Sequence, residues 1–424
     1  MELGKLSRPI QRKYSRKMTL KMNMLSTDSF FNDQAMRTLV HTQFGGADFG
    51  ECMLTMSRIP PGDNAAWFSE WRATADRVAA IGDTCAASGH DISAREAYLR
   101  AANYYRTANV MLFGAPTAPA LIETYERESD CFREFARRAE PALQAIEIPY
   151  EDTQLHGYFC PATSSPEAAP TLIVTSGYDS TLYELYFAFV VAANRRGYHC
   201  IIFDGPGQGG ALIKHGLPMR PDWEQVIRPV VDVALTRPEV DANRIALAGW
   251  SLGGYLALRA ASGEPRLAAC VADPGLMDLW EGLCGMLPGL PDEVLQHPLQ
   301  ADPALFAPYM AHIESIPTLR WKIVQRAFWV HGVDSLPAYL DASQGFSMRN
   351  HLESIRCPVF IAQEENDPLA ASAPEVYAAI KAPKTLVQFP AAEGTGDHCA
   401  ILGRSRFLQQ MFDWLDDVLA HPTD

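Results

Sequence analysis

The chain has 424 residues, a formal net charge of −14 and a hydrophobic fraction of 48%. Its acidic surface would repel a phosphate backbone, so we exclude nucleic acid as a partner, and no apolar run approaches the length of a membrane span. The nine cysteines form no C-x-x-C pair, which indicates free thiols and a cytoplasmic location.

Residues 1–25 form a basic leader. Between Lys5 and Lys21 the leader carries seven basic residues, against a single acidic residue, Glu2. No apolar segment follows, which excludes a secretory signal. An organelle transit peptide is compatible with this composition, but we favour a disordered tail or an upstream-extended start, and we expect the leader to be dispensable for folding.

Residues 26–143 are expected to form a helical N-terminal cap domain. One helix ends near Gly89, and a second follows through the sequence HDISAREAYLRAANYYRTA, in which Asp91 or Ser93 is expected to cap the first turn. No second copy of this helix pair follows, so a helical repeat protein is not expected.

Residues 144–424 are expected to form an α/β-class domain. The segments AIEIPYED and LHGYFCPA alternate like a β-hairpin, and six short apolar runs separated by helical segments follow them. Continuous apolar strands that alternate with helices predict a mostly parallel, doubly wound sheet. A stretch rich in Trp, Met, Leu and Pro, at about 279–350, predicts a helical insertion into this domain.

Ser251 lies in the sequence GWSLGG, between an apolar run and a helix-forming run. The pattern G-x-S-x-G in that setting predicts a nucleophile elbow, in which Gly249 and Gly253 let the strand and the helix approach closely. The motif also occurs by chance in unrelated proteins, so its interpretation depends on the rest of the chain.

Two further residues are expected beside Ser251, at the carboxyl ends of the strands where open α/β sheets bind ligands. Asp367 follows the run CPVFIAQEEN, and His398 lies in a glycine-rich loop after the last strand. The chain order Ser, Asp, His is that of α/β-hydrolase triads, which predicts Ser251 as nucleophile, His398 as base and Asp367 as acid. Asp273, at the end of the strand after the nucleophile helix, is the alternative acid.

Backbone N–H groups are expected to face an oxyanion at two places. One is the loop TSGYDST, through Gly177 and Tyr178, and the other is Leu252, directly after the nucleophile. No cluster of His, Cys and carboxylate residues has the spacing of metal ligands, so we expect no metal and no other cofactor.

A chamber that excludes bulk water is expected over Ser251, where the cap domain and the insertion meet the sheet. The candidates to line it are Tyr105, Asp273, Trp329 and His331. The aromatic side chains have an ordinary alternative, which is to form the core of the cap, and His331 can equally be a buried, hydrogen-bonded histidine.

The motifs together resemble a known family. The chain carries, in this order, SAREAYLRAANYYRTA, IPYEDTQLHGYF, SGYDST, FDGPGQGG, GWSLGGYLALRAA, ENDPL and EGTGDHC. This combination, which runs from about residue 60 to the end, resembles the α/β-hydrolases grouped with 2,6-dihydroxypseudooxynicotine hydrolase. Fungal hydrolases that shorten polyketides and the fermentation-respiration-switch esterases are related to that group.

The resemblance implies a homodimeric, cofactor-free hydrolase with a helical cap. It implies cleavage of a carbon–carbon bond, an ester or a lactone in a mid-sized aromatic or polyketide-like small molecule, with Ser251, Asp367 and His398 as the triad. Where the family often has Gly-Gly, this chain has Ser176 and Gly177, a change that retains the backbone donors.

Three other functions stay open at this stage. A cyclase or lyase of the same fold would use the same base without net hydrolysis, and a peptidase would use the same triad on an amide. Nothing in the sequence suggests a propeller domain or an acidic anchor for a peptide amine. A non-enzymatic receptor is disfavoured because all three triad residues are present.

Overall fold

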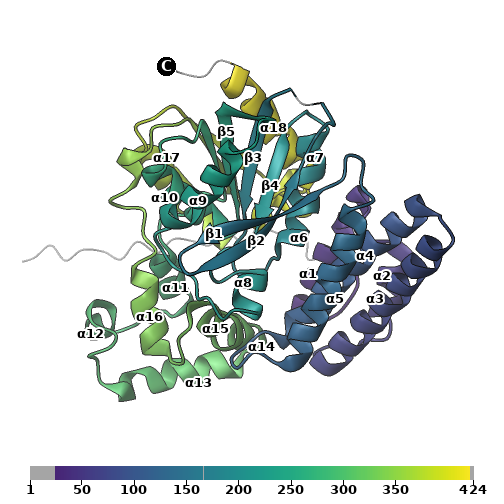
Figure 1. The fold of residues 1–424 in the computed structure, drawn as a ribbon. Coiled ribbons are helices and arrows are strands. Elements are labelled where there is room, and N and C mark those ends of the chain that lie inside the picture. Colours follow the sequence, from purple (N-terminus) through teal and green to yellow (C-terminus); the bar gives the residue numbers. More distant parts are fainter. Residues whose placement is uncertain (1–23, 166, 421–424) are drawn as a thin grey trace, which may run out of the picture.

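A computed structural model describes residues 24–165 and 167–420, so most of the basic leader lies outside the described residues. Figure 1 shows the purple and blue N-terminal helices beside a twisted sheet, and the green helices of the insertion gathered at one end of that sheet. Within the described part of the chain, no helix is long and apolar enough to cross a membrane.

The N-terminal region is helical, as the sequence predicts. Aspartates at the N-caps begin several of its helices, and Asp28, for example, accepts hydrogen bonds from the N–H groups of Phe30 and Phe31. The five α-helices are α1 (Ser29–Leu39), α2 (Phe49–Met56), α3 (Asn64–Ala87), α4 (Asp91–Asn109) and α5 (Pro119–Ala136).

The predicted cap of α4 is wrong. His90 occupies the N-cap position and makes no side-chain hydrogen bond there, and Asp91 is already the first helical residue. The Asp91 carboxylate instead pairs with Arg138 at 3.1 Å. Its charge still suits the first turn, because the N-terminal end of a helix carries a partial positive charge.

Among residues 24–165 and 167–420, eight strands form one sheet, in the order β1-β2-β4-β3-β5-β6-β7-β8. The hairpin β1–β2 is antiparallel, β2 also pairs antiparallel with β4, and the remaining pairs are parallel. This arrangement confirms the predicted α/β class. The strands are β1 (Gln144–Tyr150), β2 (Thr153–Cys160), β3 (Ala169–Thr175), β4 (His199–Phe203), β5 (Val240–Trp250), β6 (Ala269–Asp273), β7 (Val359–Glu364) and β8 (Lys384–Phe389).

Helices follow the parallel strands and pack on the sheet, with α10 against β5 and β6 and α18 against β6. A π-helix, Tyr186–Val190, joins two short helices after β3. The helices of this layer are α6 (Leu182–Leu185), α7 (Val191–Asn194), α8 (Gly209–Ile213), α9 (Glu224–Leu235), α10 (Gly253–Gly263), α17 (Ala373–Ala379) and α18 (Arg404–Ala420).

The insertion between β6 and β7 is helical, as predicted, and part of it has an apolar core of its own. Leu283, Ile313 and Leu340 belong to a cluster that is separate from the main core. The helices of the insertion are α11 (Leu279–Met286), α12 (Asp292–Gln296), a 3₁₀-helix (Pro303–Phe306), α13 (Ala307–Ser315), α14 (Pro317–Arg320), a π-helix (Trp321–Ala327), α15 (Phe328–His331) and α16 (Leu336–Gln344).

The main core joins the N-terminal helices to the sheet. One continuous cluster of buried apolar side chains includes Phe31 and Trp67 of the N-terminal helices, Ile201 of β4 and Leu247 of β5. Because these side chains are buried in one cluster, the hydrophobic effect stabilises the packing of the N-terminal helices against the sheet.

Candidate active site

Ser251 lies on a sharp turn between β5 and α10. Its φ of +65° is one that few residues other than glycine adopt, and its N–H donates to the carbonyl oxygen of Asp273 at 2.7 Å. A Cβ atom at Gly249 would lie 1.7 Å from the carbonyl oxygen of Gly253, and one at Gly253 would lie 2.7 Å from that of Thr175. The glycines of GWSLGG are therefore required by the close approach of strand and helix.

The structure brings Ser251, His398 and Asp367 together. The Oγ of Ser251 lies 2.9 Å from Nε2 of His398, and Nδ1 of His398 lies 2.6 Å from Oδ2 of Asp367. Asp367 follows β7, and its other carboxylate oxygen accepts from the N–H of Leu369 at 3.0 Å. These contacts fix the imidazole with one nitrogen toward the hydroxyl and the other toward the carboxylate.

The pKa of His398 is shifted in opposite directions by the loss of hydration and by its ion pair with Asp367. The protein around the imidazole removes part of its hydration and so acts to lower the pKa of His398, but the charge and hydrogen bond of Asp367 prevail and raise it above 6.5. At Asp367, burial acts to raise the pKa, but the charge and hydrogen bond of His398 hold it below its usual range. Because 48% of the His398 side chain is exposed, the imidazole stays accessible from solvent while the Asp367 carboxylate is buried.

The loop after β3 passes directly over Ser251. A Cβ atom at Gly177 would lie 2.8 Å from the backbone nitrogen of Leu252 and 3.1 Å from Oγ of Ser251. The side-chain amide of Gln208 donates to the carbonyl oxygen of Ser176 at 2.6 Å and so holds the start of this loop. Of the three predicted oxyanion donors, Gly177 and Leu252 therefore have backbone close to Ser251, and Tyr178 is the next residue of the same loop.

Asp273 lies close to the site but points elsewhere. Its Oδ2 accepts from Nη1 of Arg404 at 2.6 Å, and both side chains are buried. Arg404 also donates to the carbonyl oxygen of Cys399, next to His398. Burial and the neighbouring Asp273 raise the pKa of the buried Glu364 carboxyl, which favours its protonated form.

The side chain of Tyr178 joins two insertion residues. Its hydroxyl lies 2.7 Å from Nε2 of His331 and 3.3 Å from the hydroxyl of Tyr339. Burial lowers the pKa of His331 to about 3, with a further contribution from Arg326, so the imidazole that shares a hydrogen bond with Tyr178 is neutral. Of the residues predicted to line the pocket, His331 thus contacts the loop that covers Ser251.

Two other predicted pocket residues lie in packed helical layers. The Tyr105 hydroxyl donates to Asp76 of α3, and its ring is buried in the core of the N-terminal helices. Trp329 donates to Thr117 and packs against Phe113, which places it at the contact between the insertion and the N-terminal helices. Both positions fit the core alternative that the sequence left open.

One group of side chains has donor atoms close enough together for a metal ion, among the residues that the structure describes. Asp367, His398 and Cys399 have donor atoms within 4.8 Å of one another. Ser251 and Asp367 already engage both ring nitrogens of His398, and burial raises the pKa of the Cys399 thiol well above its usual range. To bind a metal here, Cys399 would have to be a thiolate and His398 would need a ring nitrogen without a hydrogen-bond partner. The arrangement therefore suits a hydrogen-bonded triad better than a metal centre.

Several residues of the site carry no signal in the sequence. Arg37, Asp179 and Arg326 form ion pairs beside the covering loop, and Arg404 joins Asp273 to the histidine loop. Each of these contacts links segments far apart in the chain. No pattern of neighbouring residues in the sequence predicts such a contact. Only Asp179 lies in a motif that the sequence analysis singled out, SGYDST.

The sequence is similar to those of known hydrolases. Residues 155–409 match the model described as the alpha/beta hydrolase family. The chain is 33% identical over 414 residues to the hydrolase acrC of Aspergillus aculeatus, a match that covers 92% of this chain and 96% of that protein. It is 32% identical over 420 residues to the 20-hydroxy-prefusarin hydrolase FUS2 of Gibberella moniliformis, covering 95% of this chain and all of that protein.

A solved structure matches over nearly the same length. The crystal structure of the 2,6-dihydroxy-pseudo-oxynicotine hydrolase has a TM-score of 0.70 and 25% sequence identity, and the match covers 91% of this chain and 98% of that one. The resemblance inferred from the motifs is therefore confirmed.

Proposed function

The chain belongs to the alpha/beta hydrolase family, and from this premise we propose that it is a serine hydrolase with Ser251 as nucleophile, His398 as general base and Asp367 as the acid that orients the base. One observation carries the proposal. The hydroxyl, the imidazole and the carboxylate form an unbroken hydrogen-bonded line, with heavy-atom distances of 2.9 and 2.6 Å.

The reaction begins with transfer of the Ser251 proton to Nε2 of His398, while Oγ forms a bond to the substrate carbonyl carbon. The carbonyl oxygen becomes an oxyanion and is bound by backbone N–H groups of the loop at Gly177 and Tyr178 and of Leu252. When the bond to the leaving group breaks, His398 returns the proton to that group. Water then hydrolyses the acyl-enzyme with the same base.

We propose that the substrate is a mid-sized aromatic or polyketide-like molecule, cleaved at a carbon–carbon bond next to a ketone or at an ester or lactone. Relatives along the whole chain are named hydrolases, and one is named for its action on 20-hydroxy-prefusarin. Tyr178, whose hydroxyl contacts His331 and Tyr339, is the half-buried aromatic residue of the loop beside Ser251, and we propose that its ring contacts such a substrate.

The setting in which the enzyme works is part of the same proposal. We expect a small-molecule substrate, no cofactor, a cytoplasmic location and the homodimer that the family resemblance implies. All nine cysteines are free, which agrees with a reducing compartment.

The proposal is tested by turnover in water enriched in heavy oxygen. Hydrolysis of an ester, lactone or β-diketone should place the heavy isotope in the carboxylic acid product, as measured by mass spectrometry. A cyclase or lyase that uses the same base would leave the product unlabelled. Product formed without label in every substrate class would therefore contradict a hydrolase.

The pH profile of an ester substrate is a second test. We expect kcat/KM to rise with pH through an apparent pKa above 6.5, because only neutral His398 can accept the serine proton and its pKa is raised. The measurement is kcat/KM at closely spaced pH values, with intactness of the fold checked at each. Activity that stays constant well below pH 6.5 would contradict the role of His398.

A further inference from the structure

Asp179 forms ion pairs with two arginines that lie far apart in the sequence. Its Oδ1 accepts from Nη1 of Arg37 at 3.0 Å, and its Oδ2 accepts from Nη1 of Arg326 at 2.8 Å. Arg37 belongs to α1 and Arg326 to the π-helix Trp321–Ala327 of the insertion. The two segments that cover the site therefore meet at one carboxylate.

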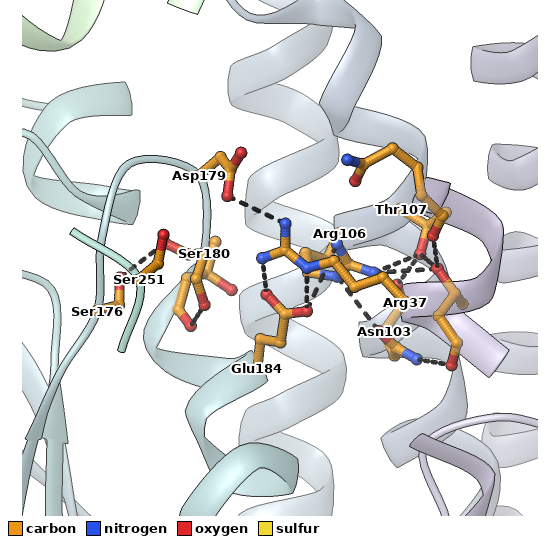
Figure 2. A network of polar contacts seen from close by, with 12 residues as sticks. Arg37, Asn103, Arg106, Thr107, Ser176, Asp179, Ser180, Glu184 and Ser251 are labelled. Atoms are coloured by element: carbon orange, nitrogen blue, oxygen red, sulfur yellow. Dashed lines mark hydrogen bonds and ion pairs between the residues drawn. The ribbon is translucent and has the colours of Figure 1, made fainter. Parts of the chain in front are cut away.

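Arg37 is itself held in place by a buried carboxylate. Its Nε donates to Oε1 of Glu184 at 2.7 Å and its Nη2 to the other oxygen of the same group, as Figure 2 shows. Glu184 lies on α6, has a fully buried side chain and also lies near Arg106 and His41. This bidentate pair fixes the direction of the Arg37 guanidinium toward Asp179.

The other side of the same loop faces the nucleophile. Asp179 follows Gly177 and Tyr178, and the Gly177 backbone lies against Ser251 and Leu252. Figure 2 shows Ser176, Ser180 and Ser251 on one side of the loop and Asp179 reaching toward Arg37 on the other. In addition, the Arg326 guanidinium stacks over the Tyr178 ring, 4.7 Å from its centroid. The loop is thus held from outside at Tyr178 and Asp179, directly after the Gly177 backbone that lies against Ser251.

We propose that Asp179 is a positioning residue for the oxyanion site, and that Arg37 and Arg326 act through it to aim the backbone donors at Gly177 and Tyr178. The inference rests on the proposed serine hydrolase function. It implies that the donors are aligned when the N-terminal helices and the insertion are both packed against the loop. The N-terminal helices and the insertion would then position the backbone donors of the oxyanion site as well as cover it.

The charges of the cluster suit an oxyanion nearby. Arg37, Arg106 and Arg326 are cations, whereas Asp179 and Glu184 are anions, and burial lowers the pKa of His41 so that it stays neutral. Burial acts to raise the pKa of Asp179, but the two arginines hold it well below its usual range. These five groups by themselves sum to one positive charge, and Lys322 is a further charged group that interacts with Asp179. An unpaired Asp179, in contrast, would repel the developing negative charge.

The test compares Asp179→Asn with wild type on an activated ester and on a trifluoromethyl ketone that carries the same acyl chain. The ketone forms a tetrahedral adduct with Ser251 whose oxygen occupies the oxyanion site. We expect kcat to fall by about 10- to 100-fold, with KM within about threefold, because donors misplaced by a fraction of an ångström lose transition-state contacts. The inhibition constant of the ketone should rise in proportion to the loss in kcat/KM.

Variants of the two arginines extend the test. Arg37→Met and Arg326→Met should show the same proportionality, and Arg37→Lys and Arg326→Lys should lose less than the methionine variants. Arg58→Met, which removes an exposed ion pair with Glu70, is the matched control and should behave like wild type. If Asp179→Asn does not fold, the lysine variants are decisive, because they retain the charges of the cluster.

Two results would overturn the inference. One is wild-type kinetics in the folded variants, and the other is a loss confined to KM with unchanged ketone binding, which would make Asp179 a substrate contact. Failure of the proposed function itself would look different, since wild-type protein would then form no ketone adduct at Ser251. An adduct in wild type with no change in the variants rejects only the role of Asp179.

Discussion

Ser251→Ala is expected to lower kcat by on the order of 10⁴-fold or more, without loss of the fold. The reason is chemical, because alanine cannot form the acyl-enzyme while His398 and the backbone donors stay in place. A fluorophosphonate probe should label the wild-type protein at Ser251 and leave the variant unlabelled. The measurements are kcat on an activated ester, the site of labelling by peptide mass spectrometry, and the melting temperature.

Ser262→Ala is the matched control for this substitution. Ser262 lies on α10, the helix that follows Ser251, and its hydroxyl donates only to a backbone carbonyl of the same helix, that of Arg259. Removal of this hydroxyl should leave kcat and labelling at wild-type levels. If the Ser251 variant kept its labelling and turnover, the nucleophile would have to be another residue.

Asp367→Asn is expected to lower kcat by on the order of 10³- to 10⁴-fold, whereas Asp273→Asn should lower kcat of the folded protein by no more than about tenfold. An amide at position 367 cannot stabilise the imidazolium and favours the wrong tautomer of His398. Asp273 makes its ion pair with Arg404, so its replacement weakens a buried pair and should reduce stability by up to about 3–5 kcal/mol.

The two aspartate variants are compared by kcat, corrected for the folded fraction, and by urea unfolding. The comparison separates two roles that the sequence alone left open, because Asp273 ends β6 and Asp367 follows β7 at the same edge of the sheet. A wild-type kcat in Asp367→Asn together with an inactive, folded Asp273→Asn would reverse the assignment.

The parts of the site that the sequence predicts are those governed by local pattern. The glycines around Ser251 are needed within a few residues of it, so the motif signals the turn. Asp367 and His398 follow apolar strands, and a parallel sheet brings the ends of such strands to one edge. These residues could be located from strand order without knowledge of any side-chain contact.

The parts that the sequence does not predict depend on packing between distant segments. The aromatic character of Tyr105 suits a pocket and a core equally well, and only the packing of α3 and α4 places its hydroxyl on Asp76. Likewise, Arg37 and Arg326 are ordinary surface residues by local pattern until the N-terminal helices and the insertion meet at Asp179. The cap of α4 was missed because a residue that is a good N-cap is also favourable one position later.

The two covering segments differ in how they are anchored, and this difference bears on how a substrate enters. Opening the N-terminal helices would expose part of the main core, since Phe31 and Trp67 belong to the same buried cluster as the sheet. The outer helices of the insertion, α11 to α13 and α16, bury their apolar side chains largely against one another, through Leu283, Ile313 and Leu340. A unit with its own core can swing aside intact at a small cost in exposed apolar surface. Trp321, Trp329 and Val330 of the insertion belong to the main core, so we expect only its outer helices to move aside for a substrate, with the N-terminal helices and the rest of the insertion staying in place.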